Sequence, residues 1–112
     1  MLDLDKIKPM QKAEWHTIKV GTRIDAMSFQ NFKATCDKAI EANNSKIALD
    51  FEATHFVSMV GFKYIHELYV KINEMRGDLL LVSTSEKLKK QALIYAHKDI
   101  RALFRTKVEL GL

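Results

Sequence analysis

Short apolar segments of this chain have the length and composition of β-strands. Trp15–Val20 alternates polar and apolar side chains and is rich in β-branched residues, which predicts a strand with one half-buried face. Lys46–Phe51 and Leu79–Val82 are short, nearly continuous apolar runs, which is typical of buried strands. Two further strands are predicted, one around Leu103–Val108 and an edge strand at Leu4–Ile7 that Pro9 interrupts.

Between these segments the apolar residues recur every three or four positions, which is the period of a helix with one buried face. Three helices are predicted in this way, and the second of them runs from Met59 to Met75. The buried stripes consist of Phe29, Phe32, Cys36 and Ile40 in the first helix, Ile65, Leu68, Ile72 and Met75 in the second, and Leu88, Ala92 and Tyr95 in the third.

Capping residues stand at the expected ends of these helices. Ser28 has the side chain of an N-cap for the first helix. Gly77 follows the second helix where a C-cap glycine is expected. Ser83 and Glu86 have the spacing of a capping box for the third helix, and Ser85 competes as its N-cap.

The elements alternate as strand, helix, strand, helix, strand, helix, strand. Because helices of this length connect strands by crossovers, the order predicts an α/β fold with a largely parallel or mixed sheet. We expect a single domain over residues 1–112, with a mixed four- or five-stranded sheet and about three to four helices packed on it.

The composition is that of an ordinary globular domain. Of its 112 residues, 18 are Lys or Arg and 14 are Asp or Glu, which gives a net charge of +4. This excess is small for a nucleic-acid-binding protein, so nucleic acid is not an expected partner, and the basic residues of the C-terminal third are interpreted as a solvated face. A single cysteine and the lack of a long apolar segment or a signal-peptide pattern predict a cytoplasmic protein with no membrane span.

No sequence motif predicts catalysis, a metal site or a cofactor. His66 and Glu67 begin like a zinc-protease helix motif, but Val70 occupies the position of the required second histidine. We therefore expect a non-enzymatic protein without a cofactor, in which Cys36 is a small core residue.

The stretch LDFEATHFVSMVGF is similar, without a gap, to the characteristic segment of STAS domains, whose usual form is Leu-Asp-Leu, several residues, then Phe-Ile-Asp-Ser-Ser-Gly-Leu. Gly61 falls on the family glycine. GTRIDAMSF resembles the family's Gly-x-Leu-Asp turn, with Gly21 and Asp25 in place, and LVSTSEKLKKQAL is similar to the turn before the family's third helix. The resemblance extends from about Trp15 to about Val108.

STAS domains include bacterial anti-sigma factor antagonists, C-terminal domains of sulfate transporters and a small subunit of a lipid-trafficking ABC system. The resemblance therefore implies a protein–protein interaction module in bacterial partner switching or stress signalling. Its partner would be an anti-sigma kinase-like protein or a larger signalling or transport protein, and the family leaves room for a homodimer. The alternatives are a soluble subunit of an ABC-type lipid transport system and a domain that senses a nucleotide or another small ligand.

The chain departs from the family in the loop that carries the phosphorylated serine of sigma-regulating members. Here Ser58 replaces the loop aspartate, and Met59, which has no hydroxyl, replaces the phosphoacceptor. Ser58 is then either the N-cap of the following helix, which we favour, or a phosphoacceptor shifted by one position. Phe56 and Val57 are predicted to lie in the core. The candidate partner-binding loop consists of Ser58, Met59, Val60 and Phe62, of which at least one apolar side chain should be exposed, since successive residues of a helix point about 100° apart.

Overall fold

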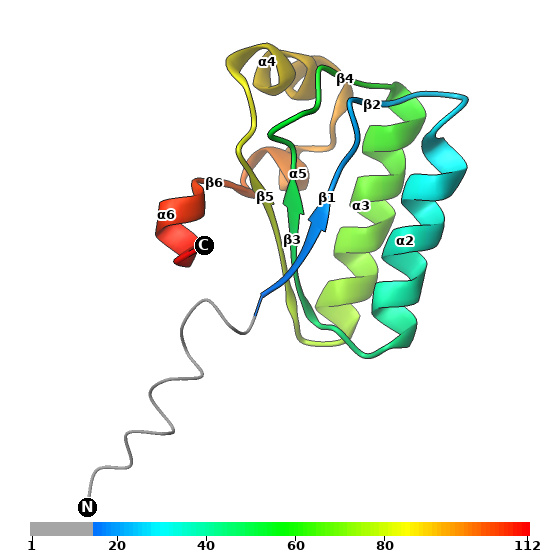
Figure 1. Ribbon diagram of the computed structural model, residues 1–112, viewed down its shortest axis with the longest axis vertical. Coiled ribbons are helices and arrows are strands. Elements are labelled where there is room, and N and C mark those ends of the chain that lie inside the picture. The colour runs from blue at the N-terminus through cyan, green and yellow to red at the C-terminus, as the bar shows by residue number, and fades with distance from the viewer. Residues whose placement is uncertain (1–14) are drawn as a thin grey trace, which may run out of the picture.

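The computed structural model describes residues 15–112, and the edge strand expected at Leu4–Ile7 lies outside them. Four strands form the central sheet: β1 (His16–Lys19), β3 (Lys46–Asp50), β5 (Asp78–Val82) and β6 (Phe104–Arg105). They are hydrogen-bonded in the order β1-β3-β5-β6, and each neighbouring pair is parallel. The predicted α/β fold is confirmed (Figure 1). The sheet was expected to be mixed, with four or five strands, and in the described residues it has four strands that are all parallel. The same residues form five helices, where about three to four were expected.

Two long helices, α2 (Phe29–Glu41) and α3 (Met59–Glu74), run side by side along the sheet (Figure 1). Tyr64 of α3 holds them together, because its ring makes edge contacts with Phe29 and Phe32 of α2. Its hydroxyl also donates a 2.7 Å hydrogen bond to Asp37 Oδ1. Three further helices follow: α4 (Glu86–Tyr95), α5 (Lys98–Arg101) and α6 (Lys107–Leu110). In the described part of the chain, no helix has the length and apolar character needed to cross a membrane.

The central strands lie in the core as the apolar runs predict. Leu49 and Val82 are buried in the neighbouring strands β3 and β5, and Phe51 is buried directly after β3. Leu80 is half-buried. The carboxylate of Asp50 is buried as well, and Lys107 Nζ lies 3.1 Å from its Oδ2.

A second, two-stranded parallel sheet was not predicted from the sequence. It pairs β2 (Arg23–Ile24) with β4 (Phe56–Val57), so that Ile24 lies opposite Val57. Strands of two residues are too short for any alternation of polar and apolar positions to be visible. This small sheet joins the turn after β1 to the segment before α3.

The position of Gly77 predicts the left-handed conformation of a C-cap glycine, but Gly77 does not adopt it. Arg76 takes it instead, with φ 59°, and the Gly77 N–H donates to the Ile72 carbonyl over 2.9 Å. Gly77 is needed for another reason, because a Cβ at this position would lie 1.8 Å from the Ser45 carbonyl oxygen. The glycine permits close contact between the two loops that lead into β3 and β5.

The start of α4 and the C-terminal segment also differ from expectation. Ser85, the competing candidate, is the N-cap of α4 and accepts a hydrogen bond from the Leu88 N–H. A last strand was predicted around Leu103–Val108, but only Phe104–Arg105 (β6) is a strand, and the prediction is wrong for the residues that follow. Thr106 and Glu109 form a capping box there, which begins α6.

Candidate functional site

The small sheet fixes the candidate loop to the turn that follows β1. The Ser58 N–H donates to the Ile24 carbonyl over 2.8 Å, and the His55 N–H donates to the Thr22 carbonyl over 2.8 Å. The buried hydroxyl of Thr54 donates to the Gly21 carbonyl over 2.7 Å. The two stretches that resemble the family motif and the family turn are therefore one structural unit.

Asp25 organises this turn. Its Oδ1 accepts hydrogen bonds from the N–H groups of Met27 and Ser28, at 3.0 and 3.1 Å. The bond from the Ser28 N–H is the main cause of a lowered pKa of Asp25, and the nearby Arg23 guanidinium acts in the same direction. Ser28 stands at the N-cap position of α2, but its side chain makes no cap bond and donates to the Arg23 carbonyl instead.

Ser58 is the N-cap of α3, as we favoured from its sequence position. Its Oγ accepts a hydrogen bond from the Gly61 N–H at 3.1 Å, and its backbone is extended. Gly61 packs tightly on the small sheet, because a Cβ there would lie 2.8 Å from Val57 Cγ1 and 2.9 Å from Ile24 Cγ2. The family glycine is thus required by the contact between the first turn of α3 and the small sheet.

The apolar residues at the start of α3 divide between surface and core. Met59 and Val60 are 64% and 57% exposed, whereas Phe62 is buried. The expectation that at least one of them is exposed is therefore confirmed. Val57 is buried as predicted, but Phe56 is exposed and its expected place in the core is wrong. Met59, which the motif resemblance aligns with the phosphoacceptor of sigma-regulating members, lies on the surface.

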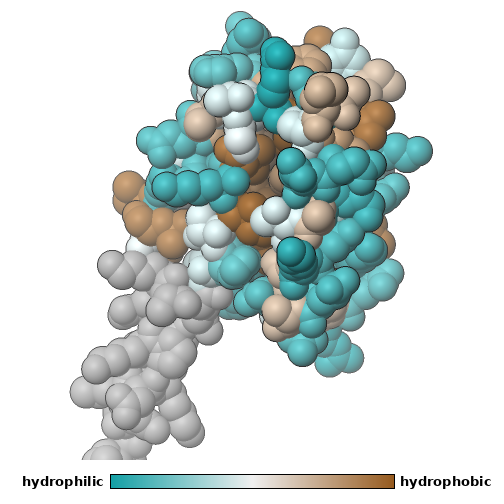
Figure 2. Space-filling model, turned by 45° about the vertical axis from the view of Figure 1, so that its right-hand side comes forward, coloured by the Kyte–Doolittle hydropathy of each residue, from teal (hydrophilic) through white to brown (hydrophobic). Residues whose placement is uncertain are grey.

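A groove of about 600 Å³ runs between the start of α3 and the end of α4, and we call it the α3–α4 groove. Figure 2 shows hydrophobic residues near the top of the molecule, the end at which α4 and the start of α3 lie in Figure 1. Tyr95 was assigned from the sequence to the buried stripe of α4, but it is 50% exposed. The groove is lined by Met59, Val60, Phe62, Lys63, His66, Tyr95, Ala96 and His97.

The α4 side of this groove was missed in the sequence. Leu93, Ile94 and Tyr95 are three consecutive apolar residues at the end of a short helix, and all three are exposed. Three successive helical positions cannot all face the core, so the run LIY was a signal that an apolar side chain of α4 reaches the surface.

Two histidines and an aspartate meet at the edge of the groove. His66 Nε2 and His97 Nδ1 lie 3.4 and 3.3 Å from Asp99 Oδ2. The two imidazole rings are stacked, with centroids 4.0 Å apart. Sequence spacing did not reveal this cluster, because His66 belongs to α3 and the other two residues belong to the short helix α5 and its N-cap.

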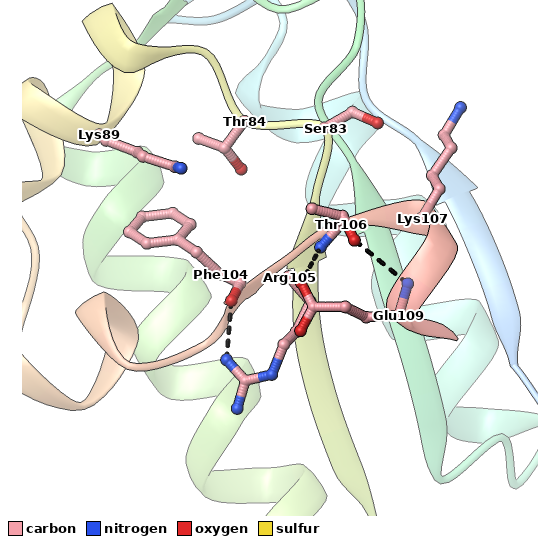
Figure 3. Close-up of a pocket in the computed structure, with 8 residues that line it drawn as sticks. All are labelled: Ser83, Thr84, Lys89, Phe104, Arg105, Thr106, Lys107 and Glu109. Atoms are coloured by element: carbon pink, nitrogen blue, oxygen red, sulfur yellow. Dashed lines mark hydrogen bonds between the residues drawn. The ribbon is translucent and has the colours of Figure 1, made fainter. Parts of the chain in front are cut away.

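A second hollow, of about 210 Å³, lies beyond the ends of β5 and β6 (Figure 3). Most of its polar lining bonds within the protein: Arg105 donates to the Phe104 carbonyl, and Lys107 Nζ donates to Glu52. Within the described residues, the buried Thr84 Oγ1 has no hydrogen-bond partner. None of the candidate loop residues lines this hollow.

Comparisons with known proteins agree with the motif and the fold. The family model of the STAS domain matches residues 9–110. Among solved structures, the chain is similar to the anti-sigma factor antagonist SpoIIAA in its unphosphorylated form, with a TM-score of 0.70 and 15% sequence identity. The similarity covers 82% of this chain and 78% of that chain. No curated protein sequence matches the chain.

Proposed function

The chain belongs to the STAS domain family, and from this premise we propose that it is a non-catalytic module that binds a partner protein through the α3–α4 groove. The observation that carries the proposal is the exposure of Met59, Val60 and Tyr95 around one hollow. Apolar side chains that gather at a concave surface are characteristic of interaction sites. Methionine and tyrosine suit such a surface, because one adapts its shape and the other combines a large apolar ring with a hydroxyl.

The position of the groove supports an anti-sigma kinase-like partner. Met59 stands where sigma-regulating STAS domains carry their phosphoacceptor, so the groove includes the surface that such a kinase must approach. The first turn of α3 is held by the Ser58 cap and by the packing of Gly61. A preorganised surface loses less conformational entropy on binding than a mobile loop does.

Regulation at this position would differ from that of the phosphorylated members. Met59 cannot accept phosphate, so the surface would stay in the unmodified state. Ser58 is the shifted candidate, and it is half-buried, with its Oγ already accepting the Gly61 N–H. We propose that Ser58 acts mainly as the helix cap and that the module is either unregulated at this loop or regulated elsewhere.

The test is a binding titration with the purified histidine-kinase-like protein encoded nearest to the gene of this chain. Tyr95→Ser should weaken binding at least tenfold, since a central aromatic residue of an interface often contributes more than 1.4 kcal/mol. Val108→Ser is the matched control, because Val108 is an exposed apolar residue of α6. Equal effects of the two substitutions would contradict the proposed surface.

The volume of the groove also supports the ligand-sensing alternative. Pockets for small molecules span about 300–1,000 Å³ and are lined mainly by apolar side chains. Native mass spectrometry of freshly purified protein would show a retained ligand as a discrete added mass. Loss of this mass in Tyr95→Ser would place the ligand in the groove and would favour sensing over partner binding.

A further inference from the structure

We propose that His66, His97 and Asp99 form a binding site for a divalent transition-metal ion of the zinc class. Imidazole and carboxylate groups are ordinary ligands of such ions. One potential ligand atom from each of the three side chains lies within 4.8 Å of the others. The proposal concerns these residues alone and does not depend on the partner of the groove.

Two of the three separations among these atoms are close to those of a tetrahedral site. Zinc binds histidine nitrogen and carboxylate oxygen at about 2.0–2.2 Å, which places neighbouring ligand atoms roughly 3.3–3.5 Å apart in a tetrahedron. Asp99 Oδ2 lies 3.4 Å from His66 Nε2 and 3.3 Å from His97 Nδ1. The pair of His66 and Asp99 therefore already has the separation that coordination requires, whereas His97 has to change its ring orientation.

The hydrogen bonding around His97 shows what a metal ion would displace. His97 Nδ1 accepts a 3.1 Å hydrogen bond from the Asp99 N–H, and this bond occupies the one in-plane lone pair of the nitrogen. The same nitrogen lies 3.3 Å from Asp99 Oδ2. Coordination of an ion by Nδ1 therefore replaces the cap bond at the start of α5.

The ligands are held by helices that pack on each other. His66 follows the fully buried Ile65 on α3, and Ile100, which is also fully buried, anchors α5. His97 is the adaptable ligand, since its side chain is 44% exposed. A metal lies close to the plane of each imidazole that binds it, so coordination requires His97 to turn out of its stack with His66. The open side, toward the α3–α4 groove, leaves room for water as a fourth ligand.

The experiment is a titration of the metal-free full chain with ZnSO₄. Isothermal titration calorimetry measures the affinity, and native mass spectrometry measures the number of ions bound. We expect one ion per chain. His66→Gln and Asp99→Asn should each raise Kd at least tenfold, since even the loss of residues that only orient ligands typically weakens metal binding 10–100-fold. His55→Gln is the control, because His55 is exposed and lies outside the cluster.

A second measurement separates loss of a ligand from loss of the fold. In ¹H–¹⁵N NMR spectra of the imidazoles, zinc should shift His66 and His97 and leave His16 and His55 in place. Thermal melts of the variants in the presence of a chelator would show whether they remain folded. The absence of saturable binding, or an Asp99→Asn protein that binds zinc as the parent does, would overturn the proposal.

Discussion

Met59→Asp tests whether the start of α3 is an interaction surface or part of the core. Met59 is the first residue of α3 and is 64% exposed. The substitution places a carboxylate at the position that the motif resemblance aligns with the phosphorylated serine of sigma-regulating STAS domains. It therefore imitates the modification that this chain cannot receive at Met59.

The structure predicts a small effect of this substitution on stability. Full burial of a methionine side chain contributes about 1.5–3 kcal/mol, and roughly a third of this one is buried, so about 0.5–1 kcal/mol is lost. An acidic residue in the first turn of a helix interacts favourably with the helix dipole and returns about 0.3–1 kcal/mol. The two effects nearly cancel, and we expect Tm to change by less than about 4 °C.

The effect on partner binding should be large. A carboxylate that is desolvated at an interface without a partner costs several kcal/mol. A loss of about 3 kcal/mol corresponds to roughly a hundredfold increase in Kd. Binding should therefore fall sharply in a protein whose fold is unchanged.

The assay combines a thermal melt with a titration of the kinase-like partner, and Val108→Asp on α6 serves as the charge-matched control. Unchanged affinity of Met59→Asp would remove this position from the interface. A large drop in Tm would instead show that Met59 contributes to the core, and the reasoning from its exposure would be refuted.

Three further outcomes are expected. Gly61→Ala should destabilise the fold by about 1 kcal/mol in a thermal melt, because overpacking against Val57 and Ile24 outweighs the better helix propensity of alanine. Gly21→Ala should be neutral in the same melt, because a Cβ at Gly21 would meet no atom within 4 Å. Burial raises the pKa of Cys36 to about 12, so its thiol should resist an aromatic disulfide reagent at pH 8 until the chain unfolds; rapid reaction of the native protein would contradict its burial. Phosphopeptide mapping after incubation with the proposed kinase-like partner should find no stoichiometric phosphate in residues 54–62, and quantitative phosphate on Ser58 would show that the acceptor has moved.

Much of the fold could be predicted because the signals were local and repeated. The stripes on α2 and α3 and the apolar runs of β3 and β5 extend over several residues, so each element was visible on its own. Helix ends were harder, because the choice between Ser83 and Ser85 as the cap of α4 depends on backbone geometry. Gly77 was correctly noticed but wrongly explained, since the close contact with Ser45 is a tertiary feature.

Only part of the candidate site could be predicted from the sequence, because the rest depends on tertiary contacts. The motif resemblance located Ser58 and Met59, but the groove also needs Tyr95, which a helical period had assigned to the core. The cluster of His66, His97 and Asp99 depends on the packing of α5 against α3. Residues brought together only by tertiary structure leave no spacing signal in the sequence.

The order of strands in the central sheet has a consequence for how the domain forms. Because the spatial order β1-β3-β5-β6 is also the order in the chain, each strand pairs with one that the ribosome has already released. The sheet can therefore grow in one direction during synthesis, without waiting for a later strand to insert between earlier ones. Among residues 15–112, every pairing of this sheet joins strands separated by a connecting segment, so none of these pairings is a hairpin. Each pairing therefore requires closure of a crossover, which slows folding relative to local contacts.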